Sequence, residues 1–99
     1  MIRKRVYTDM KKDFRAELRA YMTECLVNAR KTEHMTQAEF SQMLKMDTRS
    51  YAALEHGENL CSTLTFMIYL CYFCKDVDEL IFDLRMIIDK ADVKARPYS

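Results

Sequence analysis

Hydrophobic residues recur every three or four positions over most of the chain, which is the spacing of one face of an α-helix. A first long stretch runs from about residue 8 or 9 to residue 30, with apolar positions at Phe14, Leu18, Tyr21, Met22, Cys25, Leu26 and Ala29. Shorter stretches follow at about 36–44, 48–56, 62–74 and 76–90. The pattern predicts five helices, and therefore an all-α fold.

Polar residues that can cap a helix stand at the start of each later stretch. The predicted N-caps are Thr36, Asp47, Ser62 or Thr63, and Asp76. Glu39 lies three residues after Thr36, and Glu79 lies three residues after Asp76, which is the spacing of a capping box. Gly57, the chain's only glycine, follows His56 where a left-handed C-cap residue is expected.

The two middle stretches form the most informative part of the sequence. Phe40, Met43 and Leu44 share one helical face, residues 45–47 form a turn, and the helix 48–56 is expected to bury Tyr51, Leu54 and Ala52. Two short helices joined by a tight turn predict a helix-turn-helix. The main known use of this motif is to place its second helix in the major groove of DNA.

An ordered set of short motifs carries a family resemblance. The motifs are Ala29-Arg30-Lys31, Thr36-Gln37-x-Glu39-Phe40-Ser41, Leu54-Glu55-x-Gly57, Ser62 at the start of an apolar helix, and Val77-Asp78-Glu79-Leu80-Ile81. With these motifs the chain resembles the lambda repressor-like (Cro/XRE-type) helix-turn-helix DNA-binding family from about Glu24 to Leu84. The resemblance implies a five-helix lambda repressor-like domain, here with an extended first helix.

The resemblance also implies a sequence-specific DNA-binding transcriptional regulator that reads the major groove with helix 48–56. The implied DNA-binding residues are Gln37, Thr48, Arg49, Ser50, Ala53 and Asn59. Arg49 can form two hydrogen bonds with guanine, and Ala53 can contact a thymine methyl group. The family's counterpart of Gln37 contacts the phosphate backbone and braces the recognition helix.

Several residues depart from the family pattern. Lys45 stands where the family has a glycine in the turn, and Ala53 stands where it often has an arginine. Cys61 replaces a proline and Cys74 replaces a glycine, while Glu58 would oppose phosphates. These departures weaken the expected affinity for DNA. Glu58, Ala52, Ala53 and the acidic body of the chain favour an alternative function, a helix-turn-helix-fold module that binds a protein, as in antitoxins or regulator partners, with weak or no DNA binding.

Charge is distributed unevenly along the chain. Residues 1–31 carry nine Lys/Arg against four Asp/Glu, a net of +5, and residues 32–99 carry seven against eleven, a net of −4. Residues 1–8 are expected to form an irregular basic arm that contacts phosphates. The alternative is a solvated start of the chain without a partner.

Length and composition bound the remaining possibilities. Residues 1–99 are expected to form a single domain with a polar tail at 90–99, and 49% hydrophobic residues suffice for a core. No apolar run is as long as a membrane span, and the first residues lack the apolar segment of a signal peptide. We therefore expect a cytoplasmic protein that does not enter a membrane.

The cysteines and the other reactive residues do not suggest catalysis. Cys71 and Cys74 have the spacing of half a zinc or redox motif, but they lie in an apolar helical run without Gly or Pro. We interpret Cys25, Cys61, Cys71 and Cys74 as reduced, small hydrophobic residues. No metal, cofactor, small-molecule substrate or catalytic residue is expected, and the protein is not expected to be an enzyme.

The last two helices carry more apolar surface than their neighbours. The segment 62–74 is apolar on nearly every side, and a helix of that kind is normally buried. A 99-residue monomer has little room to bury it, so we expect a homodimer through the fourth and fifth helices. The alternative is a filled monomer core that also packs the long first helix.

Overall fold

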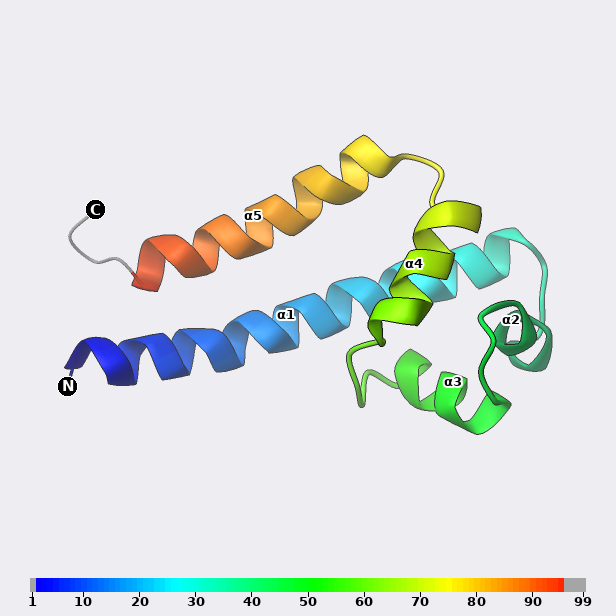
Figure 1. The fold of residues 1–99 in the computed structure, drawn as a ribbon, viewed down its shortest axis with the longest axis horizontal. Helices are drawn as coiled ribbons and strands as arrows, with labels where there is room; N and C mark the ends of the chain where they lie inside the picture. The colour runs from blue at the N-terminus through cyan, green and yellow to red at the C-terminus, as the bar shows by residue number, and fades with distance from the viewer. Residues whose placement is uncertain (1, 96–99) are drawn as a thin grey trace. The chain divides into compact units, whose positions relative to one another are not determined.

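The computed structural model describes the backbone of residues 2–95 and the side chains of residues 14–90. It has five helices: α1 Ile2–Thr32, α2 Gln37–Met43, α3 Thr48–Glu55, α4 Thr63–Tyr72 and α5 Val77–Ala95 (Figure 1). No strand occurs within residues 2–95. The predicted all-α class and the five predicted helices are confirmed.

The chain divides into two compact units. Residues 19–75 form one, which we call the central unit, and residues 1–18 together with 76–99 form the other, the terminal unit. The central unit contains the end of α1 with all of α2, α3 and α4. That residues 1–99 act as one domain stays a prediction.

Both ends of the described chain are more helical than the sequence pattern predicted. Helix α1 begins at Ile2, so the irregular conformation predicted for residues 1–8 was wrong at residues 2–8, while their contact with phosphates stays a prediction and residue 1 lies outside the described residues. Residues 2–12 contain no glycine or proline and several Arg, Lys and Met, which favour helix, so nothing ends the helix there. For the same reason α5 continues to Ala95, and only residues 96–99 of the predicted polar tail lie outside the described residues.

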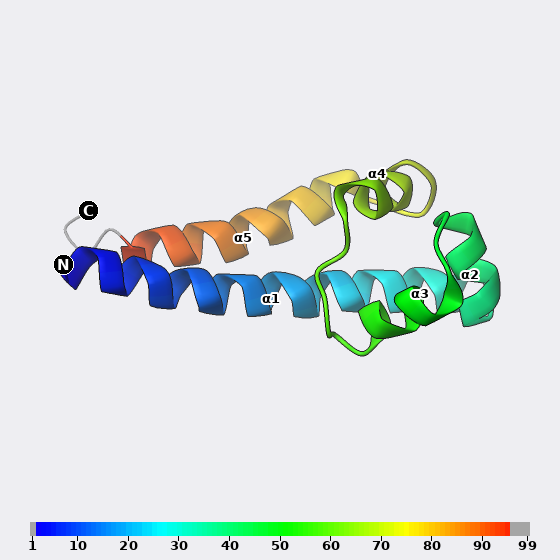
Figure 2. The same cartoon turned by 60° about the horizontal axis from the view of Figure 1, so that its bottom comes forward.

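The central unit is built around a compact aromatic and aliphatic core. Its buried hydrophobic residues are Met22, Leu26, Phe40, Leu44, Tyr51, Leu54 and Tyr69. The Phe40 ring meets Tyr51 edge-on at a centroid distance of 5.3 Å and Phe73 at 4.8 Å. Phe40 thereby joins α2 to α3 and to the end of α4, and Figure 2 shows these helices gathered around the C-terminal part of α1.

The predicted N-caps are confirmed. The side chains of Thr36, Asp47, Ser62 and Asp76 accept hydrogen bonds from the backbone N–H three residues on. Around Thr36 the capping box is complete, because the Glu39 carboxylate accepts from the Thr36 N–H at 2.9 Å. Each cap satisfies a backbone donor that the helix leaves free, and so fixes where the helix begins.

Three successive helices end in the same way. After α1, α2 and α3 the backbone turns at His34, Lys45 and Gly57, whose φ angles are 57°, 62° and 74°. At each end the next N–H returns to a carbonyl five residues earlier: Met35 to Arg30, Met46 to Ser41 and Glu58 to Ala53. These are Schellman motifs, and the left-handed residue in them is usually glycine. Only one of the three is glycine here.

Two predictions about burial were wrong. Met43 was placed on the buried face with Phe40 and Leu44, but its side chain is 47% exposed. It lies about 100° around the helix from Leu44, and seven residues of α2 bury only a narrow stripe. Helix α3 buries Tyr51 and Leu54 as predicted, but Ala52 is only half-buried. Helix α4 buries Thr65 and Tyr69 and leaves Leu64, Met67 and Tyr72 exposed, which agrees with the expectation that a unit this small cannot bury the whole helix.

The terminal unit is simpler. On its α5 part Leu80 is buried, whereas Phe82 and Met86 are exposed. Lys90 Nζ of α5 lies 3.9 Å from Glu17 Oε2 of α1. Within the described residues no helix is both long enough and apolar enough to span a bilayer.

Candidate nucleic-acid interface

Helices α2 and α3 pack against each other across the turn at residues 44–47. Besides the edge-on contact of Phe40 with Tyr51, the hydroxyls of Ser41 and Thr48 lie 3.3 Å apart where the two helices meet. Ser41 is fully buried and its hydroxyl donates to the Ala38 carbonyl at 2.8 Å. This packing fixes the angle between the two helices and presents one end of α3 to solvent.

The other end of α3 is held by a group of polar side chains that we call the Glu55 cluster, formed by Arg30, Gln37, Tyr51 and Glu55. Arg30 of α1 donates from Nε to Glu55 Oε2 at 2.6 Å and from Nη2 to Oε1 at 3.1 Å. Gln37 Nε2 of α2 donates to Oε1 at 2.9 Å, and the Tyr51 hydroxyl donates to Oε2. The cluster therefore ties three helices to one carboxylate.

The cluster keeps Glu55 ionised. Burial alone raises the pKa of the Glu55 carboxyl, but hydrogen bonds from Arg30, Tyr51 and Gln37 outweigh it and leave the pKa below its ordinary value. Burial and the neighbouring carboxylate raise the pKa of Tyr51, so its hydroxyl remains a donor.

A further hydrogen bond joins α1 to α3. The Thr23 hydroxyl of α1 donates to the Leu54 carbonyl at 2.9 Å.

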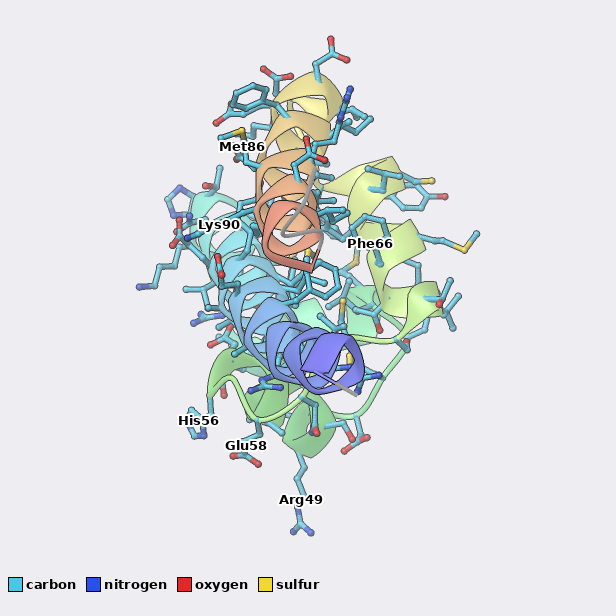
Figure 3. The ribbon with its side chains drawn as sticks, turned by 90° about the vertical axis from the view of Figure 1, so that its left-hand side faces the viewer. Arg49, His56, Glu58, Phe66, Met86 and Lys90 are labelled. Atoms are coloured by element: carbon cyan, nitrogen blue, oxygen red, sulfur yellow. The ribbon has the colours of Figure 1, made fainter. Side chains whose placement is uncertain are left out.

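The N-terminal end of α3 is open. Thr48, Arg49 and Ser50 are exposed, and Ala53 is half-buried one turn further along. In Figure 3 the Arg49 side chain points away from the ribbon. The structure thus brings four of the six predicted DNA-binding residues onto one short stretch of helix whose opposite side is packed into the central unit.

Asp47 shapes the electrostatics of this end. Its carboxylate accepts from the Ser50 N–H at 3.1 Å and from the Ser50 hydroxyl at 2.7 Å. These hydrogen bonds, with the nearby Arg49 guanidinium, lower the pKa of Asp47, so a negative charge stands beside the one cation of α3. The Ser50 hydroxyl proton is engaged by Asp47, which leaves its oxygen as an acceptor.

The two remaining predicted residues lie elsewhere in the central unit. Gln37, the first residue of α2, is half-buried and its amide nitrogen is bound to Glu55 rather than directed outward. Asn59 is exposed in the loop that follows Gly57. Gln37 therefore fills the predicted role of bracing α3, while its predicted contact with phosphate stays a prediction.

Sequence reasoning missed the Glu55 cluster. The sequence motifs contain Arg30, Gln37 and Glu55, but nothing in the sequence analysis connects these three residues. A signal was present, because Tyr51 and Glu55 are four residues apart and share a helical face with a buried side. A carboxylate on that face requires a cation, but the sequence does not show which one reaches it.

The cysteines form no evident metal site. Cys25, Cys61 and Cys74 are half-buried and Cys71 is exposed. Burial raises the pKa of the Cys25 and Cys61 thiols, which keeps them protonated. Among the residues whose side chains the structure describes, no group of three His, Cys, Asp or Glu is arranged to hold a metal ion.

Comparison of the chain with protein-family models, with curated proteins and with solved structures gave no match. The resemblance to the Cro/XRE family therefore rests on the sequence motifs themselves.

Proposed function

We propose that this protein is a sequence-specific DNA-binding transcriptional regulator of the Cro/XRE type, which reads the major groove with α3. The observation that carries the proposal is the division of α3 into two ends. Its C-terminal end is fixed by the Glu55 cluster, and its N-terminal end presents Thr48, Arg49 and Ser50 to solvent. A recognition helix needs both properties, because base contacts are made by residues near its N-terminus on a rigid support.

Each exposed residue has a chemical role in this proposal. Arg49 donates two hydrogen bonds to guanine O6 and N7, which discriminates against other bases by about 1–3 kcal/mol. Thr48 contacts a base or a phosphate through its hydroxyl, the Ser50 oxygen accepts from a base amino group, and Ala53 meets a thymine methyl group. The Asp47 carboxylate repels phosphate, so we expect modest affinity for a single copy.

We further propose that the protein acts in the cytoplasm as a homodimer. Two copies related by a two-fold axis present two α3 helices to half-sites about one helical turn of DNA apart. Dimerisation compensates for modest affinity per copy, because the second α3 then binds within the same complex.

The test is fluorescence anisotropy with mixed-sequence duplex DNA at increasing salt concentration, for wild type, Arg49→Ala and the control Arg85→Ala. We expect binding at low salt that weakens steeply as salt rises, because phosphate contacts release counterions. Arg49→Ala should weaken binding about tenfold, and Arg85→Ala, which removes an exposed arginine of α5, should change it less than twofold. Absence of binding at low salt, or equal losses in both variants, contradicts the proposal.

A second candidate function is supported by the same surface. Asp47 and Glu58 are exposed acidic residues near α3, and Ala53 offers no hydrogen bond to a base. These features suit a helix-turn-helix-fold module that binds a protein. If DNA does not bind at any salt concentration, this candidate replaces the first.

A further inference from the structure

Helix α4 carries an apolar surface without any charge. Its sequence, Thr63–Tyr72, contains no Asp, Glu, Lys, Arg or His. Leu64, Met67 and Tyr72 are 58%, 55% and 77% exposed, and Cys71 between them is exposed as well. An uncharged helix with half of its large side chains in water is unusual on the surface of a monomer.

The outward-facing residues have the spacing that a second helix requires. Leu64, Met67, Cys71 and Tyr72, which are exposed, and Ile68, which is half-buried, stand at positions i, i+3, i+7, i+8 and i+4, and so form one stripe along α4. Thr65 and Tyr69 point to the opposite side and are buried in the central unit. Helix α4 thus has two apolar faces, of which the central unit covers one. We call the outward-facing set the α4 stripe.

Neighbouring residues enlarge the stripe. Leu60, just before α4, is 46% exposed. At the other end, Ile68 and Tyr72 line a groove together with Met43 of α2, but Glu33, Glu39 and Lys45 line it as well, so the uncharged surface ends there. A specific interface buries roughly 800 Å² on each partner, and α4 alone is only about 15 Å long. The uncharged surface formed by α4 and Leu60 is therefore small, which suits a weak association.

The absence of charge favours α4 over α5 as the contact between two copies. In a two-fold contact residue i of one copy meets residue j of the other, so every charge that is buried there needs an opposite charge at the matching position, whereas an uncharged stripe needs none. The other exposed apolar surface, on α5, interleaves Phe82 and Met86 with Asp78, Arg85 and Asp89. Self-association there would bring these charges into the contact.

We propose that the α4 stripe is the surface through which two copies of this chain associate, and that the apolar residues of α5 do not form this interface. The inference rests on the homodimer of the proposed function. It limits the expected interface, which was the fourth and fifth helices, to α4. It does not require that α3 bind DNA, since self-association is measured on the protein alone.

The experiment is sedimentation equilibrium of the full chain, without DNA, from about 1 to 300 µM. It compares wild type with Met67→Glu and with the matched control Met86→Glu, which are 55% and 57% exposed in the wild type. Glutamate favours helix, and both methionines are more than half exposed, so both variants should fold. Leu64→Lys provides a second test with the opposite charge, and circular dichroism establishes the helix content of each variant.

We expect wild type to dimerise with a Kd of about 1–100 µM, as suits a small interface. Met67→Glu and Leu64→Lys should each raise the Kd at least tenfold, and Met86→Glu should change it less than threefold. A monomer throughout the concentration range, or a larger effect of Met86→Glu than of Met67→Glu, overturns the inference. A dimer that fails to bind DNA would contradict the proposed function and leave this inference standing.

Discussion

Glu55 is the residue on which the arrangement of α1, α2 and α3 most depends. Its side chain is 7% exposed and receives hydrogen bonds from Arg30, Gln37 and Tyr51. Removing one member of a fully buried ion pair costs about 3–5 kcal/mol, and the cost here lies at the low end of that range because the Arg30 side chain, 18% exposed, regains contact with water. We predict that Glu55→Ala lowers the free energy of unfolding by about 3 kcal/mol, measured by urea denaturation.

Glu58→Ala provides the control for Glu55→Ala. The Glu58 side chain is 61% exposed and its carboxylate lies 3.7 Å from His56 Nδ1, a contact that water screens. We expect it to change the free energy of unfolding by less than about 0.5 kcal/mol. Similar losses in the two variants would show that the Glu55 cluster contributes little to stability.

The Glu55 carboxyl group should also make the stability of the fold depend on pH. Burial raises the pKa of Glu55, but its hydrogen bonds lower it by more, so the pKa in the folded protein lies below the ordinary value of 4.5. The stabilising contribution is therefore complete above about pH 5 and is lost as pH falls through the folded pKa. We predict that the urea midpoint falls between about pH 5 and pH 3. In Glu55→Gln that decrease should be smaller, and an unchanged pH profile in this variant would contradict the assignment.

Among the helical elements, the ends of α1 and α2 carry strain, because a residue other than glycine adopts the left-handed conformation there. Lys45 holds a φ of 62° at the end of α2, a conformation that costs an L-residue about 1–2 kcal/mol and glycine very little. We predict that Lys45→Gly raises the free energy of unfolding by about 1 kcal/mol, because relief of strain exceeds the added freedom of the unfolded chain.

Two further substitutions serve as controls for Lys45→Gly. Glu24→Gly, at an exposed position inside α1, should lower stability by about 1 kcal/mol, because glycine there only adds freedom to the unfolded chain. Gly57→Ala should also destabilise by about 1 kcal/mol, since φ is 74° although no atom lies within 4 Å of the added Cβ. If Lys45→Gly destabilises as Glu24→Gly does, the left-handed conformation carries no strain.

Element by element, local chemistry made the fold largely predictable. The caps at Thr36, Asp47, Ser62 and Asp76 depend on hydrogen bonds within one turn, which the sequence displays directly. The start of α1 was missed because charge was taken as evidence of an irregular arm, although Arg and Lys favour helix.

The candidate site was less predictable than the helices. The exposed positions 48–50 follow from helical periodicity, but the sequence did not reveal that the Gln37 amide donates to Glu55. That contact joins residues 18 apart in the chain, and the bond from Arg30 to Glu55 joins residues 25 apart. Only the packing of three helices brings these groups together, so no local pattern reveals them.

For the molecule as a whole, association through the α4 stripe should make thermal stability depend on concentration. A partner that binds only the folded chain stabilises it by mass action. We predict that the Tm of wild type rises by a few degrees between about 5 and 500 µM, measured by scanning calorimetry. Met67→Glu should show a constant Tm over the same range, and a parallel rise in this variant would place the contact elsewhere.

The separation of the two ends of α3 has a consequence for how such a protein diversifies. The residues that hold the helix, Tyr51, Leu54 and Glu55, are distinct from the residues that it displays, Thr48, Arg49 and Ser50. Exchange of Arg49, whose side chain extends into solvent (Figure 3), leaves the supporting contacts intact. The exposed residues can therefore be substituted without loss of the contacts that hold α3. A change of binding specificity then does not require a loss of stability.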